Sequence, residues 1–151
     1  ICLRGPNIMK GYWNRPDATA DAIDGEGWFH SGDIGYLDED GFLFICDRLK
    51  DMVISGGENV YPAEVEGVLY KHEAISEVAV IGTPAEKWGE AVTAVVALHE
   101  GQSLTLEELR EFAGHHLARY KLPLRMEIVE ALPRNPAGKV LKFVLKEQIT
   151  G

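Results

Sequence analysis

Four features of this sequence combine residue types that can do chemistry with positions at the predicted ends of elements: Asp33, Arg48, the pair Gly56-Gly57, and Lys139. A carboxylate accepts hydrogen bonds, and a guanidinium donates to oxyanions with a fixed fork. Paired glycines suit a backbone that takes positive φ or lets another molecule come close. Each feature alone also has an ordinary explanation: a turn acceptor, a surface ion pair, a tight turn or a solvated lysine. Only their combination can indicate a function.

Lys139 is the most informative of the four. The apolar residues Val140, Leu141, Val144 and Leu145 predict a final helix that begins beside it. A cation at a helix N-terminus opposes the helix dipole, so the placement of Lys139 needs another reason. A bound anion would supply one.

The glycine pair lies between a predicted strand and a predicted helix. Met52 to Ile54 form a short apolar run of strand type. Pro62 suits the first position of a helix, because its missing N–H would have no partner there. The sequence therefore predicts that Gly56-Gly57 form a strand-to-helix turn.

Composition limits the class of protein. The chain has 151 residues and a net charge of −9, so a nucleic acid is not expected as its partner. Cys2 and Cys46 stand far apart without a histidine cluster, and no metal site is predicted. No apolar run is long enough for a transmembrane segment and no signal segment opens the chain, which favours a cytoplasmic location. Because the chain starts at Ile1 in a strand-type segment, we expect a fragment of a longer protein.

Apolar patterning predicts an α+β protein in two parts, with a boundary at Asp47 to Lys50. Residues 1–47 are strand-rich, with a short helix from Pro16 and a β-hairpin around the acidic turn 38–41. Residues 48–151 predict a small sheet with helices packed on one face. The expected elements after the boundary are a strand at 52–54, a helix at 62–72, strands at 78–82 and 91–98 separated by a loop at 83–90, a helix from a capping box at 105 to about 120, a strand at 126–129 and a helix at 140–145.

The chain resembles the C-terminal part of the acyl-adenylate-forming (AMP-binding) enzymes, a superfamily of acyl-CoA synthetases, aryl-CoA ligases, luciferases and peptide-synthetase adenylation domains. The resemblance covers essentially the whole length and is greatest to bacterial fatty-acyl-CoA ligases. It implies that residues 1–47 are the tail of a large N-terminal AMP-binding domain and that residues 48–151 are a mobile C-terminal lid domain. The segments that carry it are GPNIMKGYWNRPDAT, GWFHSGDIGYLDEDGFLFICDRLKDMVISGGENVYPAEVE, KWGE, ARYKLP and PRNPAGKVLK.

The resemblance implies an ATP-dependent acyl-CoA synthetase, which joins a carboxylic acid to CoA through an acyl-adenylate, with a fatty acid as the favoured substrate. Lys139 matches the catalytic lysine that bridges the acyl carboxylate and the α-phosphate. ATP, CoA and Mg²⁺ would be bound mainly by the preceding N-terminal domain, so the fragment alone is expected to be inactive in adenylation. Peripheral membrane association through the parent protein stays open.

The remaining site residues are assigned by the same resemblance. Asp33 would accept the ribose hydroxyls of ATP, with Arg48 as a second nucleotide contact. Lys50 matches the hinge about which the lid rotates between the two half-reactions. The residues assigned to CoA are Gly56, Gly57, Glu58, Trp88 and Tyr120, of which the last two would offer flat rings to the CoA nucleotide.

Two alternatives remain open. An aryl-CoA ligase of the coumarate or benzoate type shares every quoted motif. A non-catalytic, free-standing lid that docks on a separate partner is the second, although such a module has no need for Asp33 or Lys139.

One departure from the family pattern concerns the CoA phosphates. Some relatives use basic residues there, and the matching positions in this chain are Leu122 and Leu124. The sequence leaves Lys121 and Arg125 as possible substitutes.

Overall fold

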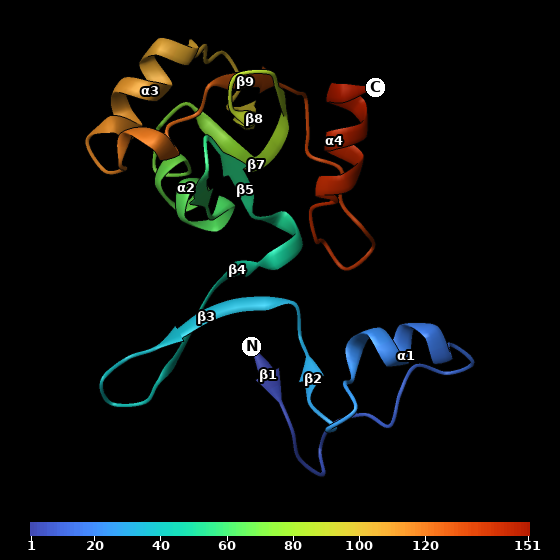
Figure 1. Cartoon of the computed structure of the whole chain (residues 1–151). Coiled ribbons are helices and arrows are strands. Elements are labelled where there is room, and N and C mark those ends of the chain that lie inside the picture. Colours follow the sequence, from blue (N-terminus) through green and yellow to red (C-terminus); the bar gives the residue numbers. More distant parts are fainter. The chain divides into compact units, whose positions relative to one another are not determined.

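The computed structural model describes all of residues 1–151 and divides the chain into two compact units, Ile1–Lys50 and Asp51–Gly151 (Figure 1). The division lies at the end of the segment 47–50 in which the sequence predicts a boundary. None of the helices combines the length and the apolar character that a membrane crossing requires. The elements of the first unit are β1 (Cys2–Leu3), α1 (Pro16–Ala22), β2 (Phe29–His30), β3 (Asp33–Leu37) and β4 (Leu43–Arg48).

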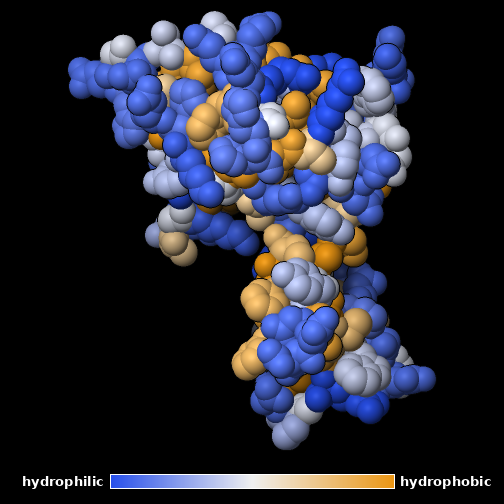
Figure 2. Space-filling view, turned by 90° about the vertical axis from the view of Figure 1, so that its left-hand side faces the viewer, coloured by the Kyte–Doolittle hydropathy of each residue, from blue (hydrophilic) through white to orange (hydrophobic).

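The predicted hairpin of the first unit is confirmed, because β3 and β4 pair in antiparallel fashion. Asp38 shapes its turn, since the Asp38 Oδ1 accepts hydrogen bonds from the N–H groups of Asp40 (3.1 Å) and Phe42 (2.8 Å). No residue of Ile1–Lys50 is buried, so this unit has no hydrophobic core of its own. Six of its exposed apolar side chains lie on the hairpin, namely Tyr36, Leu37, Phe42, Leu43, Phe44 and Ile45. Figure 2 shows hydrophobic residues on the surface of this unit.

The second unit is built on a five-stranded sheet whose central strand is β8 (Gly89–Leu98). Along one side β8 pairs antiparallel with the whole of β7 (Ile75–Ala85), and on the other it pairs parallel with β9 (Arg125–Ile128). Near its start, β8 also pairs with β5 (Val53–Ser55), which forms a hairpin with β6 (Glu58–Val60). All positions from 91 to 97 are buried.

Helices cover both faces of this sheet, so the prediction of helices on a single face is wrong. α2 (Pro62–Leu69) and α3 (Leu106–Gly114) pack on one face, where their Leu69 and Leu109 join Val92 and Val96. α4 (Lys142–Thr150) covers the other face, where Leu145 joins Ile81 and Val95. Neighbouring residues of a strand point to opposite faces, and a strand that is apolar throughout needs cover on both.

Several element boundaries differ from the sequence-based prediction. The predicted loop 83–90 is mostly strand, because β7 runs to Ala85 and β8 begins at Gly89. The helix after Thr105 ends at Gly114, a poor helix former, and the separate single turn η2 (Arg119–Lys121) follows. The last helix, α4, begins only at Lys142. The predicted capping box is confirmed by reciprocal bonds between Thr105 and Glu108.

Candidate functional site

Asp33 and Arg48 lie opposite each other at the open end of the β3–β4 hairpin. They are register partners, and the Arg48 Nε lies 3.1 Å from the Asp33 Oδ1. The Asp33 side chain is 24% exposed and that of Arg48 is 47% exposed, so a ligand can reach both. A cross-strand ion pair of this kind contributes only about 0.2–1 kcal/mol to stability. The hairpin therefore brings together two groups able to bind hydroxyl and phosphate oxygens.

Lys50 follows directly. It belongs to η1 (Leu49–Asp51), a single 3₁₀ turn after β4, and it is the last residue of the first compact unit. Its side chain is exposed. The hinge role of Lys50 stays a prediction.

Gly56 and Gly57 form the turn of the β5–β6 hairpin, and not the strand-to-helix turn that the sequence predicts. Ser55 pairs with Glu58, and the two glycines between them have φ values of 61° and 87°. Two positive φ values at a two-residue turn are typical of type I′, whose twist matches that of the strands. The sequence-based prediction did not include β6, because Glu58 and Asn59 have low strand propensity. Glu58 opens β6 with an exposed side chain.

The glycine turn packs against the indole of Trp88. The Gly56 N–H donates to the Trp88 carbonyl at 2.8 Å, and a Cβ atom at position 56 would lie 2.7 Å from Cε3 of the indole. A Cβ atom at position 57 would meet nothing within 4 Å. Gly56 is therefore required by its backbone angle and by this close approach, and Gly57 by its backbone angle alone.

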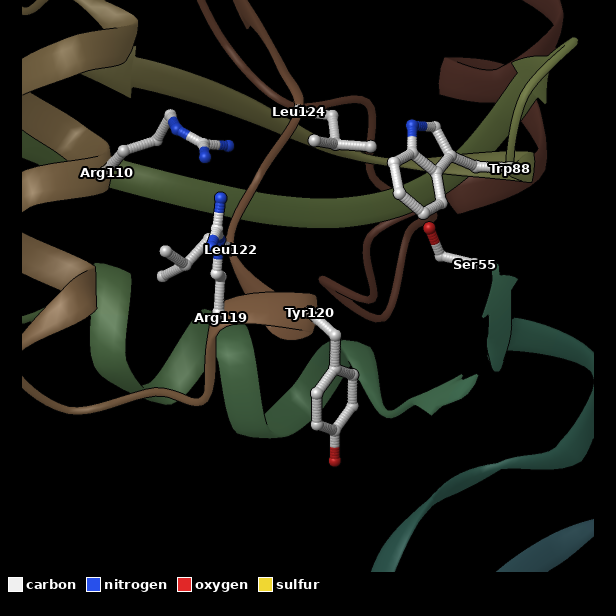
Figure 3. A pocket seen from close by; sticks show the side chains of 7 residues that line it. All are labelled: Ser55, Trp88, Arg110, Arg119, Tyr120, Leu122 and Leu124. Atoms are coloured by element: carbon white, nitrogen blue, oxygen red, sulfur yellow. The ribbon is translucent and has the colours of Figure 1, made fainter. Parts of the chain in front are cut away.

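Trp88 and Tyr120 line one pocket of about 420 Å³ in the second unit (Figure 3). The Tyr120 ring points away from the indole, so the two rings do not form a sandwich. The lining residues that sequence reasoning missed are Ser55, Arg110 and Arg119, and Leu122 and Leu124 complete the pocket. A signal for Arg119 was present, since it is the cation beside Tyr120 in the motif ARYKLP.

Lys139 lies in a closed turn ahead of α4, so the helix-dipole reason for its placement is wrong. Arg134 and Val140 form an antiparallel bridge across the base of the turn. Inside it, the Asn135 Oδ1 accepts hydrogen bonds from the N–H groups of Ala137 (3.0 Å) and Lys139 (2.9 Å). These bonds between side chain and backbone close the turn, and α4 begins at Lys142, two residues after the predicted start of the helix at position 140. They fix the backbone that carries the exposed Lys139 side chain.

The charge of Lys139 is uncompensated. Two lysines of the helix that follows are paired, Lys142 with Glu66 at 2.7 Å and Lys146 with Glu90 at 3.1 Å. Lys139 makes no ion pair with any residue of the chain. Its ammonium group is therefore free to bind an anion.

Glu77 of β7 anchors the base of the Lys139 turn. Its Oε2 accepts a hydrogen bond from the Leu132 N–H at 3.0 Å, and its Oε1 lies 3.1 Å from Arg134 Nη2. Arg134 in turn donates from Nη1 to the Gly138 carbonyl at 2.8 Å. The Leu132 hydrogen bond, together with the Arg134 guanidinium, holds the pKa of Glu77 below its usual value. Sequence reasoning missed Glu77 because its partners are 55 and 57 residues away.

Comparison with known proteins identifies the class. Residues 64–139 match the family described as the AMP-binding enzyme C-terminal domain, and the chain belongs to this family. The 2-succinylbenzoate–CoA ligase of Geobacillus sp. (strain WCH70) is 54% identical over 149 residues, which are 99% of this chain and 30% of the relative. The long-chain-fatty-acid–CoA ligase FadD13 of Mycobacterium tuberculosis is 53% identical over 148 residues, 98% of this chain and 29% of the relative.

Solved structures agree with this assignment. The o-succinylbenzoate CoA synthetase (MenE) from Bacillus subtilis, in complex with the acyl-adenylate intermediate OSB-AMP, has a TM-score of 0.87 and 41% identity. ATP-bound MatB from Rhodopseudomonas palustris has a TM-score of 0.88 and 41% identity. The two comparisons cover 99% and 96% of this chain, but only 30% and 29% of the solved chains. The chain thus has the mixed α+β fold of the C-terminal portion of adenylate-forming enzymes and spans about 30% of the length of its relatives.

We expect substitution of the two glycines to lower the free energy of unfolding by different amounts. Both Gly56→Ala and Gly57→Ala place an L-residue at positive φ, which costs roughly 1–2 kcal/mol. Gly56→Ala also forces its new methyl group against the Trp88 ring, so it should lower the free energy of unfolding more than Gly57→Ala does. Urea denaturation of the 1–151 chain, followed by far-UV circular dichroism, measures both. Equal losses would contradict the close packing of Gly56 on the indole.

The lowered pKa of Glu77 predicts acid sensitivity of the anchor under the Lys139 turn. Its folded pKa lies below the ordinary value of 4.5, so the carboxylate stabilises the fold above that pH, and this contribution is lost as the pH falls through the folded pKa. Glu77→Gln removes this titration. The free energy of unfolding of the variant should therefore depend less steeply on pH below about 4.5. Urea denaturation across that range is the measurement, and identical slopes would argue against the anchor.

Proposed function

We propose that this chain is the C-terminal part of an ATP-dependent acid–CoA ligase whose preferred acid is a fatty acid. The observation that carries the proposal is Lys139, an unpaired cation held on a closed turn that Glu77 fastens to the sheet. A structural lysine has no need for such a support. A lysine that must reach the reacting oxygens at a defined place does, because preorganised charge costs no rearrangement at the moment of reaction.

The first half-reaction activates the acid. A carboxylate oxygen attacks the α-phosphorus of ATP, the bond from that phosphorus to the bridging oxygen breaks, and pyrophosphate leaves with the bonding electrons. Negative charge moves from the carboxylate to the phosphates, and the Lys139 ammonium stabilises it by bridging both groups. Asp33 would accept the ribose hydroxyls, with Arg48 beside it as a second nucleotide contact.

In the second half-reaction, the CoA sulfur attacks the acyl carbonyl and AMP leaves. We assign the Gly56-Gly57 turn and Glu58 to the side of the lid that then faces the adenylate. The absence of side chains on the turn leaves room for the pantetheine arm of CoA. Trp88 and Tyr120 would meet the CoA nucleotide at the pocket that they line.

The two compact units support a division of labour. Ile1–Lys50 has no buried residue and exposes an apolar hairpin, whereas Asp51–Gly151 contains two core clusters. We propose that residues 1–47 complete a large N-terminal domain, that residues 48–151 are the mobile lid, and that Lys50 is the hinge. The chain has no group of His, Cys, Asp or Glu residues able to hold a metal ion, so the Mg²⁺ that neutralises ATP would be bound by the rest of the protein.

An aromatic acid is the second candidate substrate, favoured by the 54% identity to a 2-succinylbenzoate–CoA ligase. We place the acid-binding pocket outside this chain, which spans about 30% of the length of its relatives, and relatives of similar identity carry the names of both substrate classes. Profiling the full-length protein with fatty and aromatic acids separates the two. A higher kcat/KM for aromatic acids would overturn the fatty-acid assignment.

Lys139→Ala in the full-length protein should slow adenylate formation by about 10²–10³, the usual effect of removing one preorganised donor. Thioester formation from a supplied acyl-adenylate should change far less, because the lysine acts in the first step only. Pyrophosphate release and acyl-CoA release are measured separately. Lys71→Ala, at an exposed lysine without an ion pair, is the matched control and should leave both steps unchanged. A full adenylation rate in Lys139→Ala would show that the assignment is wrong.

A further inference from the structure

The pocket beside the glycine turn contains two arginines and no acidic residue. Arg110 comes from α3 and Arg119 from η2, and both line the same cavity of about 420 Å³ (Figure 3). The protein as a whole carries a net charge of −9, so an uncompensated pair of cations is unusual for its surface. Two guanidinium groups that line one pocket repel each other unless an anion lies between or beside them.

The two arginines are not equivalent. Arg110 is half-buried, and its Nη1 donates to the Pro123 carbonyl, so it supports the loop that carries Leu122 and Leu124. Arg119 is exposed, and although its backbone carbonyl accepts a hydrogen bond from the Leu122 N–H, its side chain forms no hydrogen bond, ion pair or ring contact with the rest of the chain. The other arginines of the second unit are engaged, Arg125 with Thr83 and Arg134 with Glu77. Arg119 is therefore the guanidinium available to a ligand.

Lys121 and Arg125, the two cations that could replace the missing basic residues, already bind other groups of the chain. Lys121 Nζ lies 2.6 and 2.7 Å from the two carboxylate oxygens of Glu64, and this contact raises the pKa of Lys121. Arg125 donates to Thr83 Oγ1 at 2.9 Å and to the Pro84 carbonyl at 3.1 Å. Neither residue lines the pocket. The expectation that Lys121 and Arg125 replace the family's phosphate contacts is thus not supported by their geometry.

We propose that Arg119 binds a phosphate of the nucleotide portion of CoA in this pocket. Arg110, which is held by its hydrogen bond to Pro123, would add to the positive electrostatic potential there. This inference rests on the proposed ligase function. An adenine ring can lie on the exposed part of the Trp88 indole, while the planar guanidinium of Arg119 offers paired donors to phosphate oxygens. The apolar residues Leu122 and Leu124 line the same pocket. Arg119 would thus take the place of the basic residues that some relatives carry at the positions of Leu122 and Leu124.

The test uses Arg119→Gln in the full-length ligase, with three thiol acceptors: CoA, 3′-dephospho-CoA and pantetheine. The variant should raise the KM for CoA about tenfold to a hundredfold, the value of a charge-assisted hydrogen bond, and should form acyl-adenylate at the wild-type rate. The KM for pantetheine should not change, because pantetheine has no nucleotide. Lys71→Ala is the matched control, since it removes an exposed cation that does not line the pocket, and its relative KM values for the three thiols should equal those of the wild type.

The 3′-dephospho-CoA arm tells which phosphate is bound. A penalty that disappears with 3′-dephospho-CoA identifies the 3′-phosphate, and one that persists there but disappears with pantetheine identifies the 5′-diphosphate; either result supports the proposal. An equal penalty with pantetheine, or no penalty with CoA, overturns it. Failure of the ligase function itself looks different, since the wild-type protein would then form no acyl-CoA from any acid.

Discussion

Burial of β8 on both faces is the constraint on which the rest of the second unit depends. The strand is buried from Ala91 to Ala97, so it demands helices above and below, and α2, α3 and α4 meet that demand. Its first residue, Gly89, pairs with Ser55 and so fixes the glycine hairpin beside Trp88. The candidate CoA pocket therefore lies at the start of β8, the most buried strand of the sheet.

The same sheet supports the Lys139 turn from its other edge. β7 contributes Glu77, which binds Leu132 and Arg134 at the base of the turn, while Leu132 itself is buried with Ile81, Val95 and Leu145. The glycine turn and the lysine turn are thus attached to opposite sides of β8. In the lid that we propose, one turn serves adenylation and the other thioester formation, and this attachment would keep the two turns in a fixed relation.

Local patterns in the sequence predict much of this fold, since they report local interactions. The β3–β4 hairpin and the capping box of α3 follow from a few neighbouring residues. The continuous apolar run of β8 is typical of a strand that is covered on both faces of the sheet, although the sequence-based prediction placed helices on one face only. The Asp33–Arg48 contact was not foreseen as a pair, because the register of the hairpin decides it.

Other parts of the site depend on contacts that no local pattern contains. Asn135 closes the turn before α4 with its side chain, although the apolar residues around position 140 suit a helix. Glu77 reaches its partners across the sheet, and Arg119 stands out only once Lys121 and Arg125 are seen to be engaged. Which cation is free is a property of the folded surface, and the sequence alone does not show it.

We propose that the full-length protein activates an acid as its adenylate and transfers the acyl group to CoA. The most direct measurement is product analysis after incubation with ATP, Mg²⁺, CoA and a panel of fatty and aromatic acids, with parallel reactions that omit CoA. We expect AMP, pyrophosphate and acyl-CoA in equal amounts, and enzyme-bound acyl-adenylate when CoA is omitted. Formation of ADP and inorganic phosphate, or no consumption of ATP with any acid, would contradict it.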